Sequence, residues 1–267
     1  MNSRALTFAV ATNRREILDR NLLASPIFRD EHPHQILVQE NYPSAAAAYN
    51  DAIERSENDL MVFLHQDMYL PESWMADLQA ALQKLKADDP HWGVLGCSGR
   101  TDENEGRGYV YSHGYGFVGE PFERLERVQT LDEIVLIFRK SSGLRFDPAF
   151  PSFHMYGSDI CLTAASRGMN CYAIPAFCIH NTQWGPVLPP EFYECYRILK
   201  RKWRDQLPIY TTCIEVTRFN APMYERRLRE VVRPWMGRAR SASPRMKDTQ
   251  KLIEMVDGLK QQLSASR

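Results

Sequence analysis

A five-residue apolar run that ends at a group of polar side chains constrains the fold more than any other feature of the sequence. The run, Leu60–Leu64, consists of Leu, Met, Val, Phe and Leu, and His65, Gln66 and Asp67 follow it directly. A strand that is covered by helices on both faces, as in a parallel sheet, has such a continuous apolar run instead of alternating apolar and polar residues. The sequence therefore predicts a buried strand here, with Asp67 held at the edge of a sheet.

Further strand and helix signals alternate along the chain. Apolar runs and helical spacings predict most of the remaining elements. The expected strands are 5–11, 35–39, 92–96, 131–139 and 171–176, and the expected helices are 14–24, 45–55, 71–85, 159–167 and 191–203. Strands that alternate with helices in this way form α/β sheets in which most strands are parallel. We therefore expect an α/β fold with a mainly parallel central sheet flanked by helices.

The C-terminal part of the chain differs in composition from the rest. Residues 233–244 are rich in small and basic side chains, and residues 248–263 carry Leu, Ile and Met at helical spacing between charged residues. We therefore expect one large domain at 1–232, followed by a basic linker and an amphipathic helix at 233–267. This helix could pair with a second copy of the chain, which would make a homo-oligomer. The basic residues before it could alternatively contact an anionic membrane surface.

The balance of charges disfavours nucleic acid as a partner. The chain has 33 Lys and Arg residues and 33 Asp and Glu residues, without the basic excess that nucleic-acid-binding domains carry. Its longest apolar runs are too short to span a membrane, and residues 1–6 lack the long apolar segment of a signal peptide. We therefore expect a cytoplasmic protein with no integral membrane segment.

Several common phosphate-binding and nucleophile motifs are absent from the sequence. It contains no G-x-x-x-x-G-K-S/T loop, and no G-x-G-x-x-G follows the first predicted strand. It also lacks the G-x-S-x-G motif that positions the serine of many hydrolases. These observations disfavour a P-loop enzyme, a dinucleotide oxidoreductase and a serine hydrolase.

Polar side chains follow three of the predicted strands at the point where each strand ends. These side chains are Thr12 and Asn13 after the first strand, 39–41 at the end of the second, and 65–67 after the third. In open α/β sheets, ligands bind outside the carboxyl ends of the strands, so all three groups could line one crevice. Asp67 could bind a divalent cation there, because such ions are shared between carboxylates and substrate phosphates. The alternative is that Asp67 caps the helix that follows it.

Two stretches resemble a known family. The first comprises residues 44–52 and 59–67, and the second comprises residues 153–162, followed by His180 and Asn181. They resemble the family 2-type glycosyltransferases of the GT-A fold and, more closely, the glycosyltransferase-like subgroup of the streptomycin-biosynthesis StrF type. In that subgroup the usual Asp-x-Asp motif appears as His-Gln-Asp, as it does at 65–67. The resemblance covers about residues 5–185 and agrees in order and spacing.

The resemblance implies a donor site. Asp67 would coordinate a divalent metal, Mn²⁺ or Mg²⁺, that bridges to the diphosphate of a UDP- or GDP-linked sugar. His180 would approach that metal from the opposite side. Residues from the three strand ends and the following helix would lie around the nucleotide. These donor-side residues are Thr12, Asn13 and Glu40, with Asn50 supporting that loop, together with His65 and Gln66 of the motif.

On the acceptor side, the resemblance makes Asp159 the catalytic base. The base has to take the proton of an acceptor hydroxyl, and a helix N-terminus favours the ionised carboxylate that this needs. His154 and Trp184 could contact the acceptor. The plainer alternatives are an ordinary helix-start carboxylate for Asp159, an aromatic core position for His154 and a packing role for Trp184.

These expectations combine into a metal-dependent transferase that moves a sugar from a nucleotide sugar to a hydroxyl acceptor, with inversion. Two departures from the family pattern support an alternative. His65 replaces an acidic residue and is a poorer ligand for Mg²⁺ than for Mn²⁺, and Ser158 and Asp159 supply one carboxylate where relatives often have two. The alternative is a degenerate, non-catalytic relative that binds a nucleotide or glycan and acts through partners.

Overall fold

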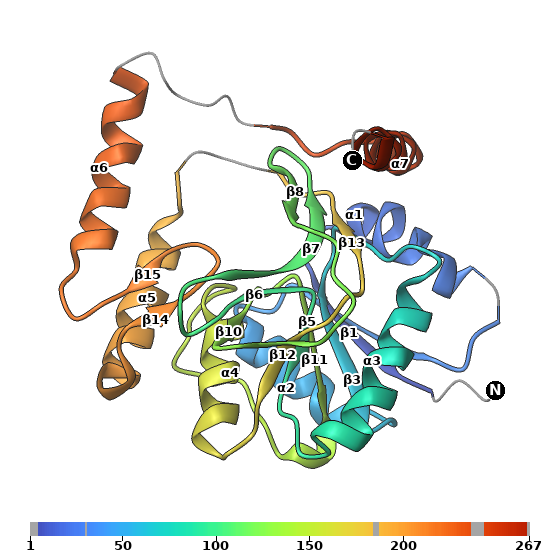
Figure 1. Ribbon diagram of the computed structural model, residues 1–267, viewed down its shortest axis with the longest axis horizontal. Helices are drawn as coiled ribbons and strands as arrows, with labels where there is room; N and C mark the ends of the chain where they lie inside the picture. The colour runs from blue at the N-terminus through green and yellow to red at the C-terminus, as the bar shows by residue number, and fades with distance from the viewer. Residues whose placement is uncertain (1–4, 30, 184–186, 236–242, 266–267) are drawn as a thin grey trace.

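The central sheet is the framework of the protein. The structure, a computed structural model, describes residues 5–29, 31–183, 187–235 and 243–265. The sheet has seven strands in the order β2-β1-β3-β11-β5-β12-β9. Their bounds are β2 Gln35–Glu40, β1 Thr7–Thr12, β3 Leu60–His65, β11 Val135–Arg139, β5 Leu95–Gly96, β12 Cys171–Ala173 and β9 Glu126–Val128. Figure 1 shows this sheet with α2, α3 and α4 packed around it.

The sheet is mainly parallel, as expected, because five of its seven strands run in the same direction and only β11 and β9 are reversed. Strand β1 runs parallel to β2 and β3, and β12 runs parallel to β5. In contrast, β11 is antiparallel to both β3 and β5, and β9 is antiparallel to β12. A parallel neighbour needs a long crossover connection, usually a helix. Short strands instead of a helix connect β5 to β11. The predicted α/β class is confirmed.

Helices cover both faces of the sheet, which explains the continuous apolar run of β3. Phe8 of β1 pairs with Val62 of β3, so Phe63 points to the opposite face. On the face of Phe8, the ring of Trp74 from α3 (Trp74–Asp88) lies 6.3 Å away, between ring centroids. On the other face, the ring of Tyr49 from α2 (Ala45–Arg55) lies 5.2 Å from that of Phe63.

The bounds of α2 follow from its sequence. Ser44 caps the helix, since its Oγ accepts a hydrogen bond from the backbone N of Ala47 at 3.2 Å. Ala45, Ala46 and Ala48 are buried, whereas Ala47 points to solvent. Small side chains on the buried face allow the helix to approach the sheet closely, so this helix lies where it can present Tyr49 beneath the end of β3.

A second sheet lies against the carboxyl ends of the first. Its strands have the order β10-β6-β7-β13-β4, with β8 paired to β7. Their bounds are β10 Thr130–Leu131, β6 Ser98–Arg100, β7 Gly106–Ser112, β13 Cys178–His180, β4 Met68–Tyr69 and β8 Gly116–Gly119. Strand β4 begins directly after Asp67, so the second sheet starts where the apolar run of the first one ends.

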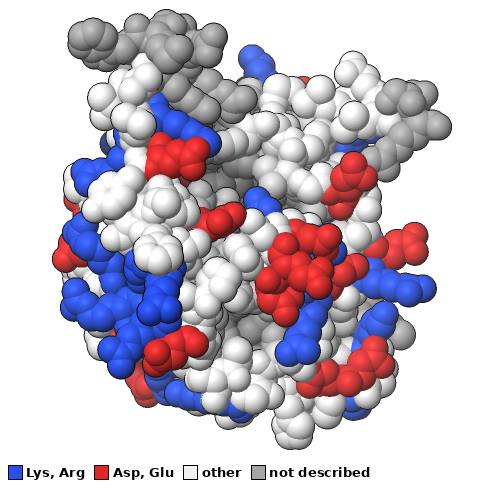
Figure 2. Space-filling view, turned by 60° about the vertical axis from the view of Figure 1, so that its left-hand side comes forward, with Lys and Arg blue, Asp and Glu red and all other residues white. Residues whose placement is uncertain are grey.

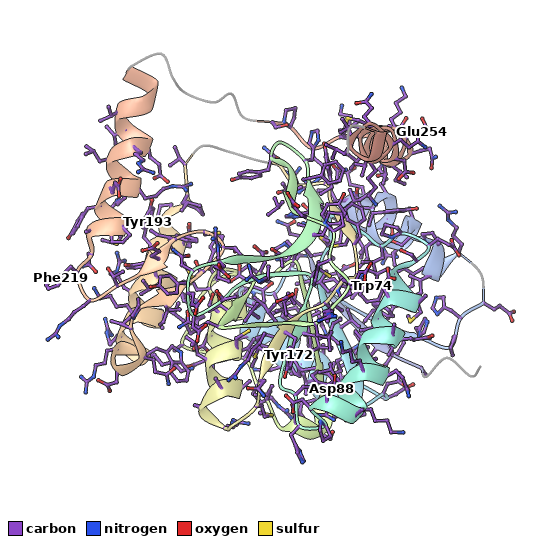
Figure 3. The ribbon with its side chains drawn as sticks, in the orientation of Figure 1. Trp74, Asp88, Tyr172, Tyr193, Phe219 and Glu254 are labelled. Carbon is purple, nitrogen blue, oxygen red and sulfur yellow. The ribbon has the colours of Figure 1, made fainter. Side chains whose placement is uncertain are left out.

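The remaining helices extend this core. They are α1 Arg15–Arg20, α4 Tyr156–Ser166, α5 Pro190–Lys202, α6 Ala221–Trp235 and α7 Thr249–Ala265, and a small hairpin pairs β14 Ile209–Tyr210 with β15 Glu215–Val216. Tyr193 points from α5 towards α6 (Figure 3), and its hydroxyl donates to Glu230 at 2.8 Å. The far side of α6 exposes Tyr224, Leu228 and Val231. Basic and acidic side chains both occur on the face shown in Figure 2.

Helix α7 packs against the body of the protein. Its Leu252 and Val256 are fully buried in a cluster with aromatic residues of β4 and β7 and with Ile179 of β13. The inner face of the helix is therefore used within the chain, whereas Met255, Leu259 and Leu263 are exposed, and pairing with a second copy stays a prediction. The expected domain boundary at residue 232 falls inside α6, because the helical spacing continues past it to Trp235. Among the described residues, no helix is long and apolar enough to cross a membrane.

Replacing Ala48 by leucine is expected to destabilise the protein, because the added atoms have no room between α2 and the sheet. The free energy of unfolding should fall by about 1–3 kcal/mol. Ala47→Leu is the matched control, since Ala47 is exposed in the same helix, and should change stability by less than about 0.5 kcal/mol. Urea denaturation of both variants measures the difference, and equal losses would contradict the packing of α2.

Candidate active site

Three strand ends form one crevice, as expected. The register places Ala11 opposite His65 and Thr12 opposite Glu40. Five of the predicted residues line a cavity of about 320 Å³ at this edge, namely Thr12, Asn13, His65, Gln66 and Asp67. Its other walls include Gln39, Asn41, Tyr42, Tyr49 and Phe153. A second cavity, of about 350 Å³, lies where α7 begins and contains none of the predicted residues.

Hydrogen bonds tie the ends of β1 and β3 together. The Thr12 hydroxyl donates to Gln66 Oε1 at 2.5 Å, and Gln66 Nε2 donates to Asn13 Oδ1 at 3.0 Å. The backbone N of Arg14 lies 3.3 Å from the same Gln66 oxygen. Gln66 therefore fixes the turn after β1, and with it the floor of the cavity.

Strand pairing brings His180 to Asp67 across 113 positions of the sequence, counted from 67 to 180. Strand β4 pairs antiparallel with β13, so that His180 lies opposite Met68, and the backbone N of Asn181 donates to Asp67 O at 2.9 Å. His180 Nε2 lies 3.3 Å from Asp67 Oδ1. The rings of His65 and His180 are 5.6 Å apart between centroids. One ligand atom from each of His65, Asp67 and His180 lies within 4.8 Å of the others.

The Asp67 carboxylate is buried and ionised. Burial raises its pKa, but the neighbouring His180, His65 and Arg245 outweigh burial and hold that pKa well below its usual range. Only 5% of the residue is exposed. A buried carboxylate is costly unless a positive charge accompanies it, so this position calls for a cation.

His65 is neutral at pH 7. Burial and the adjacent His180 lower the pKa of His65 to about 4. The Tyr156 hydroxyl donates to the Glu133 backbone oxygen at 3.2 Å, so it accepts from His65 Nε2, which lies 3.1 Å away. This arrangement assigns the ring proton to Nε2 and leaves the Nδ1 lone pair available to a ligand.

The three side chains fit a divalent cation. They supply one buried carboxylate and two imidazoles within a small space, and a neutral imidazole is a common metal ligand. Mg²⁺ prefers oxygen ligands, whereas transition-metal ions accept nitrogen and oxygen together. The donor set therefore suits an ion such as Mn²⁺ better than Mg²⁺.

An arginine that sequence reasoning did not place in the site contacts Asp67. Arg245 Nη2 lies 2.5 Å from Asp67 Oδ2, and Arg245 Nε donates to the Asn181 backbone oxygen at 2.8 Å. The only signal in the sequence was the basic composition before the last helix, which suggested a linker or a membrane contact. A contact between residues 178 positions apart leaves no local pattern.

Two expected donor-side residues lie elsewhere. Glu40 is exposed at the end of β2, with Arg15 Nη1 at 3.8 Å, while its neighbours Gln39 and Asn41 line the cavity. The Asn50 amide donates to the Phe146 backbone oxygen at 2.8 Å and accepts from the Phe146 N at 3.0 Å. Asn50 thus braces the segment before α4, which corrects the expectation that it supports the donor loop.

Asp159 is not among the residues that line the cavity, and its expected role as the catalytic base stays a prediction. It is 1% exposed, and its two oxygens accept from Lys202 Nζ at 2.8–2.9 Å and from Trp203 Nε1 at 2.7 Å. Burial raises the pKa of Asp159, and the ion pair with Lys202 opposes this rise. His154 is half-buried, with its ring 5.6 Å from that of Phe192. Trp184 lies outside the described residues.

Glu133 is an acidic group outside the set of residues expected in the site. It lies just before β11, where its carboxylate accepts from the backbone N of Gly157 at 3.4 Å. Burial, reinforced by the neighbouring Asp132, raises the pKa of Glu133 to about 8. Part of the residue still contacts solvent, and its backbone oxygen accepts from the Tyr156 hydroxyl that contacts His65. The backbone oxygen of Glu133 is therefore two hydrogen bonds away from His65, whereas its carboxylate contacts the start of α4.

Comparison with solved structures identifies the fold. The structure of GalNAc-T7 with UDP, GalNAc and Mn²⁺ matches with a TM-score of 0.52 and 10% identity, over 78% of this chain and 52% of that protein. TarS of S. aureus with UDP-GlcNAc matches at 0.47 and 14% identity, over 74% and 66% of the two chains. At 10% identity, the likeness to GalNAc-T7 shows the fold alone. The chain has the GT-A fold of nucleotide-sugar transferases.

Sequence comparison gives the family. A protein of Fuscovulum blasticum described as "ATP synthase subunits region ORF 6" is 28% identical over 166 residues, which span 60% of this chain and 66% of that protein. This chain thus matches two thirds or less of the length of each of these proteins. Residues 29–185 match the family described as "Glycosyltransferase like family". That match covers more than half of the 267 residues, and the chain belongs to this glycosyltransferase-like family.

Proposed function

We propose that this protein transfers a sugar from a nucleoside-diphosphate sugar to a hydroxyl-bearing acceptor, with a divalent cation held by His65, Asp67 and His180. The observation that carries the proposal is the convergence of these three side chains within 4.8 Å beside a cavity formed by strand ends. When bound, the ion would neutralise the charge that develops on the leaving diphosphate. The His-Gln-Asp motif also supports membership of the StrF-type subgroup.

The donor proposed here is a UDP-linked sugar used with Mn²⁺. The GalNAc-T7 structure, which shares the fold, contains UDP, GalNAc and Mn²⁺. Two imidazole ligands favour Mn²⁺ over Mg²⁺, because Mg²⁺ prefers oxygen ligands. On the walls of the cavity, Tyr42 and Phe153 offer apolar surface to a nucleobase and a sugar. Gln39 and Asn41 offer amide groups that can hydrogen-bond to the polar edge of the nucleobase.

We propose Glu133 instead of Asp159 as the base, because the carboxylate of Asp159 is already occupied. In an inverting transfer, the acceptor oxygen forms a bond to the anomeric carbon as the bond to the diphosphate breaks, and a base takes the hydroxyl proton. Lys202 and Trp203 occupy both oxygens of Asp159 in a buried setting. Glu133 is half-buried just before β11, its carboxylate contacts the start of α4, and its pKa is raised to about 8. A base with a pKa near the working pH is the most effective. We assign Asp159 to holding α5 against α4.

The donor proposal predicts nucleotide binding that depends on the metal. UDP with Mn²⁺ should raise the melting temperature of the wild-type protein more than UDP alone, because a bound ligand stabilises the folded state by about 2.7 kcal/mol at a hundred times its dissociation constant. Asp67→Asn should abolish the extra effect of Mn²⁺. The control, Asp19→Asn, changes an exposed residue of α1 and should retain it. An unchanged Mn²⁺ effect in Asp67→Asn would contradict the proposed site.

The base assignment predicts that Glu133→Gln lowers kcat by roughly 10²–10⁴ while leaving Mn²⁺ and UDP binding intact. Transfer by the wild-type protein should speed up as the pH rises towards about 8, because the carboxylate must lose its proton to act as a base. The variant should lose this dependence. Both effects are measured by the rate at which UDP is released during transfer or hydrolysis of UDP-sugars.

Asp159→Asn separates the two acidic groups. It should lower the free energy of unfolding by roughly 1–3 kcal/mol, the scale of a lost hydrogen bond to a charged group, and reduce kcat less than Glu133→Gln does. Full activity in Glu133→Gln combined with loss of turnover in a folded Asp159→Asn would reverse the assignment. Nucleotide binding without turnover of any UDP- or GDP-sugar would favour the non-catalytic alternative.

A further inference from the structure

The segment before α7 lies directly against the candidate metal site. We name residues 243–248 the C-terminal strap. Asn181 holds the strap in place, since its Nδ2 donates to Met246 O at 2.8 Å and its Oδ1 accepts from Met246 N at 3.0 Å. Asn181 is completely buried and follows His180, one of the candidate ligands. His113 Nε2 contacts the Pro244 oxygen at 3.1 Å. The strap is therefore docked by specific hydrogen bonds.

Docking of the strap places the Arg245 guanidinium on Asp67. Its Nη2 lies 2.5 Å from Asp67 Oδ2, and its Nε is held by the Asn181 backbone oxygen at 2.8 Å. The side chain of Arg245 is 20% exposed and that of Asp67 is 8% exposed. Exposed ion pairs contribute little, but a charge pair shielded from water interacts strongly. Arg245 thus supplies the positive charge that the buried carboxylate needs.

A divalent ion on the same carboxylate would compete with this guanidinium. Asp67 contributes the only carboxylate of the three-residue cluster, so an ion bound there would rely on it for charge. Two positive groups on one shielded carboxylate repel each other. Arg245 contacts Oδ2 and His180 faces Oδ1, so the guanidinium and the ion compete for the charge of one carboxylate, and each weakens the binding of the other.

When the donor is present, its diphosphate offers the displaced guanidinium another anion to bind. Its planar set of N–H groups matches the oxygens of a phosphate as well as those of a carboxylate. We propose that Arg245 exchanges partners at the donor site, pairing with Asp67 in the ligand-free protein and binding the donor's diphosphate once a divalent ion occupies Asp67. This inference rests on the proposed function, because it takes a nucleoside diphosphate and a metal as the ligands of the site.

The exchange makes a measurable link between the two ligands. Without nucleotide, the ion competes with Arg245 for Asp67, so its affinity is reduced. With nucleotide, Arg245 has a second anion to bind, and the affinity for the ion is no longer reduced. Coupling between two ligands of one site typically changes affinity by roughly 5- to 150-fold.

The test is calorimetric titration of the full-length protein with Mn²⁺, with and without a fixed concentration of UDP. The variants are Arg245→Ala, Arg245→Lys and the control Lys247→Ala, which removes one positive charge from an exposed position of the same strap. We expect every variant to fold, because Leu252 and Val256 still anchor α7. Circular dichroism checks this. Arg245→Lys serves if the alanine variant is unstable, because an ammonium lacks the planar fork and holds Asp67 less well.

Without UDP, Arg245→Ala should bind Mn²⁺ about tenfold more tightly than the wild type, and Lys247→Ala should match the wild type. With UDP, the difference between Arg245→Ala and the wild type should vanish. Equal Mn²⁺ affinities without UDP would overturn the exchange, and so would a difference that persists undiminished with UDP. Absence of Mn²⁺ binding in every variant under both conditions would instead overturn the metal site of the proposed function.

Discussion

The pairing of β4 with β13 is the interaction on which the site depends. Two residues of β4 follow Asp67, and their antiparallel pairing with β13 sets His180 Nε2 3.3 Å from the carboxylate. The next residue, Asn181, receives the strap that carries Arg245. One short stretch of backbone pairing therefore joins the end of β3, the late histidine and the C-terminal segment at a single edge.

Charge balance explains why these parts converge. Asp67 is buried and ionised, so the free energy of the folded state depends on a positive partner near it. In the ligand-free protein that partner is Arg245, at 2.5 Å. The two imidazoles beside Asp67 give the same place a donor set for a metal ion. Asp67 is thus paired with Arg245 in the ligand-free protein. When a metal ion binds to Asp67, Arg245 can leave it for another anion.

Much of the fold was predictable, because burial leaves a local pattern. The run Leu60–Leu64, covered on both faces by aromatic side chains, forms β3, and Ser44 with the alanines behind it forms α2 as expected. The closeness of Asp67 and His180 came from the family resemblance, not from any local signal. Strand β4 was missed because two residues carry no periodicity. The partners of Asp159 and Asp67 were missed because Lys202 and Arg245 reach them only in the folded chain.

The proposed ion takes its ligands from β3, the turn after it and β13. Anomalous diffraction from crystals grown with MnCl₂ and UDP locates that ion directly. We expect a manganese ion bonded to His65, Asp67 and His180 and to the UDP phosphates, with the Arg245 guanidinium moved from Asp67 to a phosphate oxygen. A manganese peak elsewhere, or bound UDP with Arg245 still paired to Asp67, would contradict the proposal.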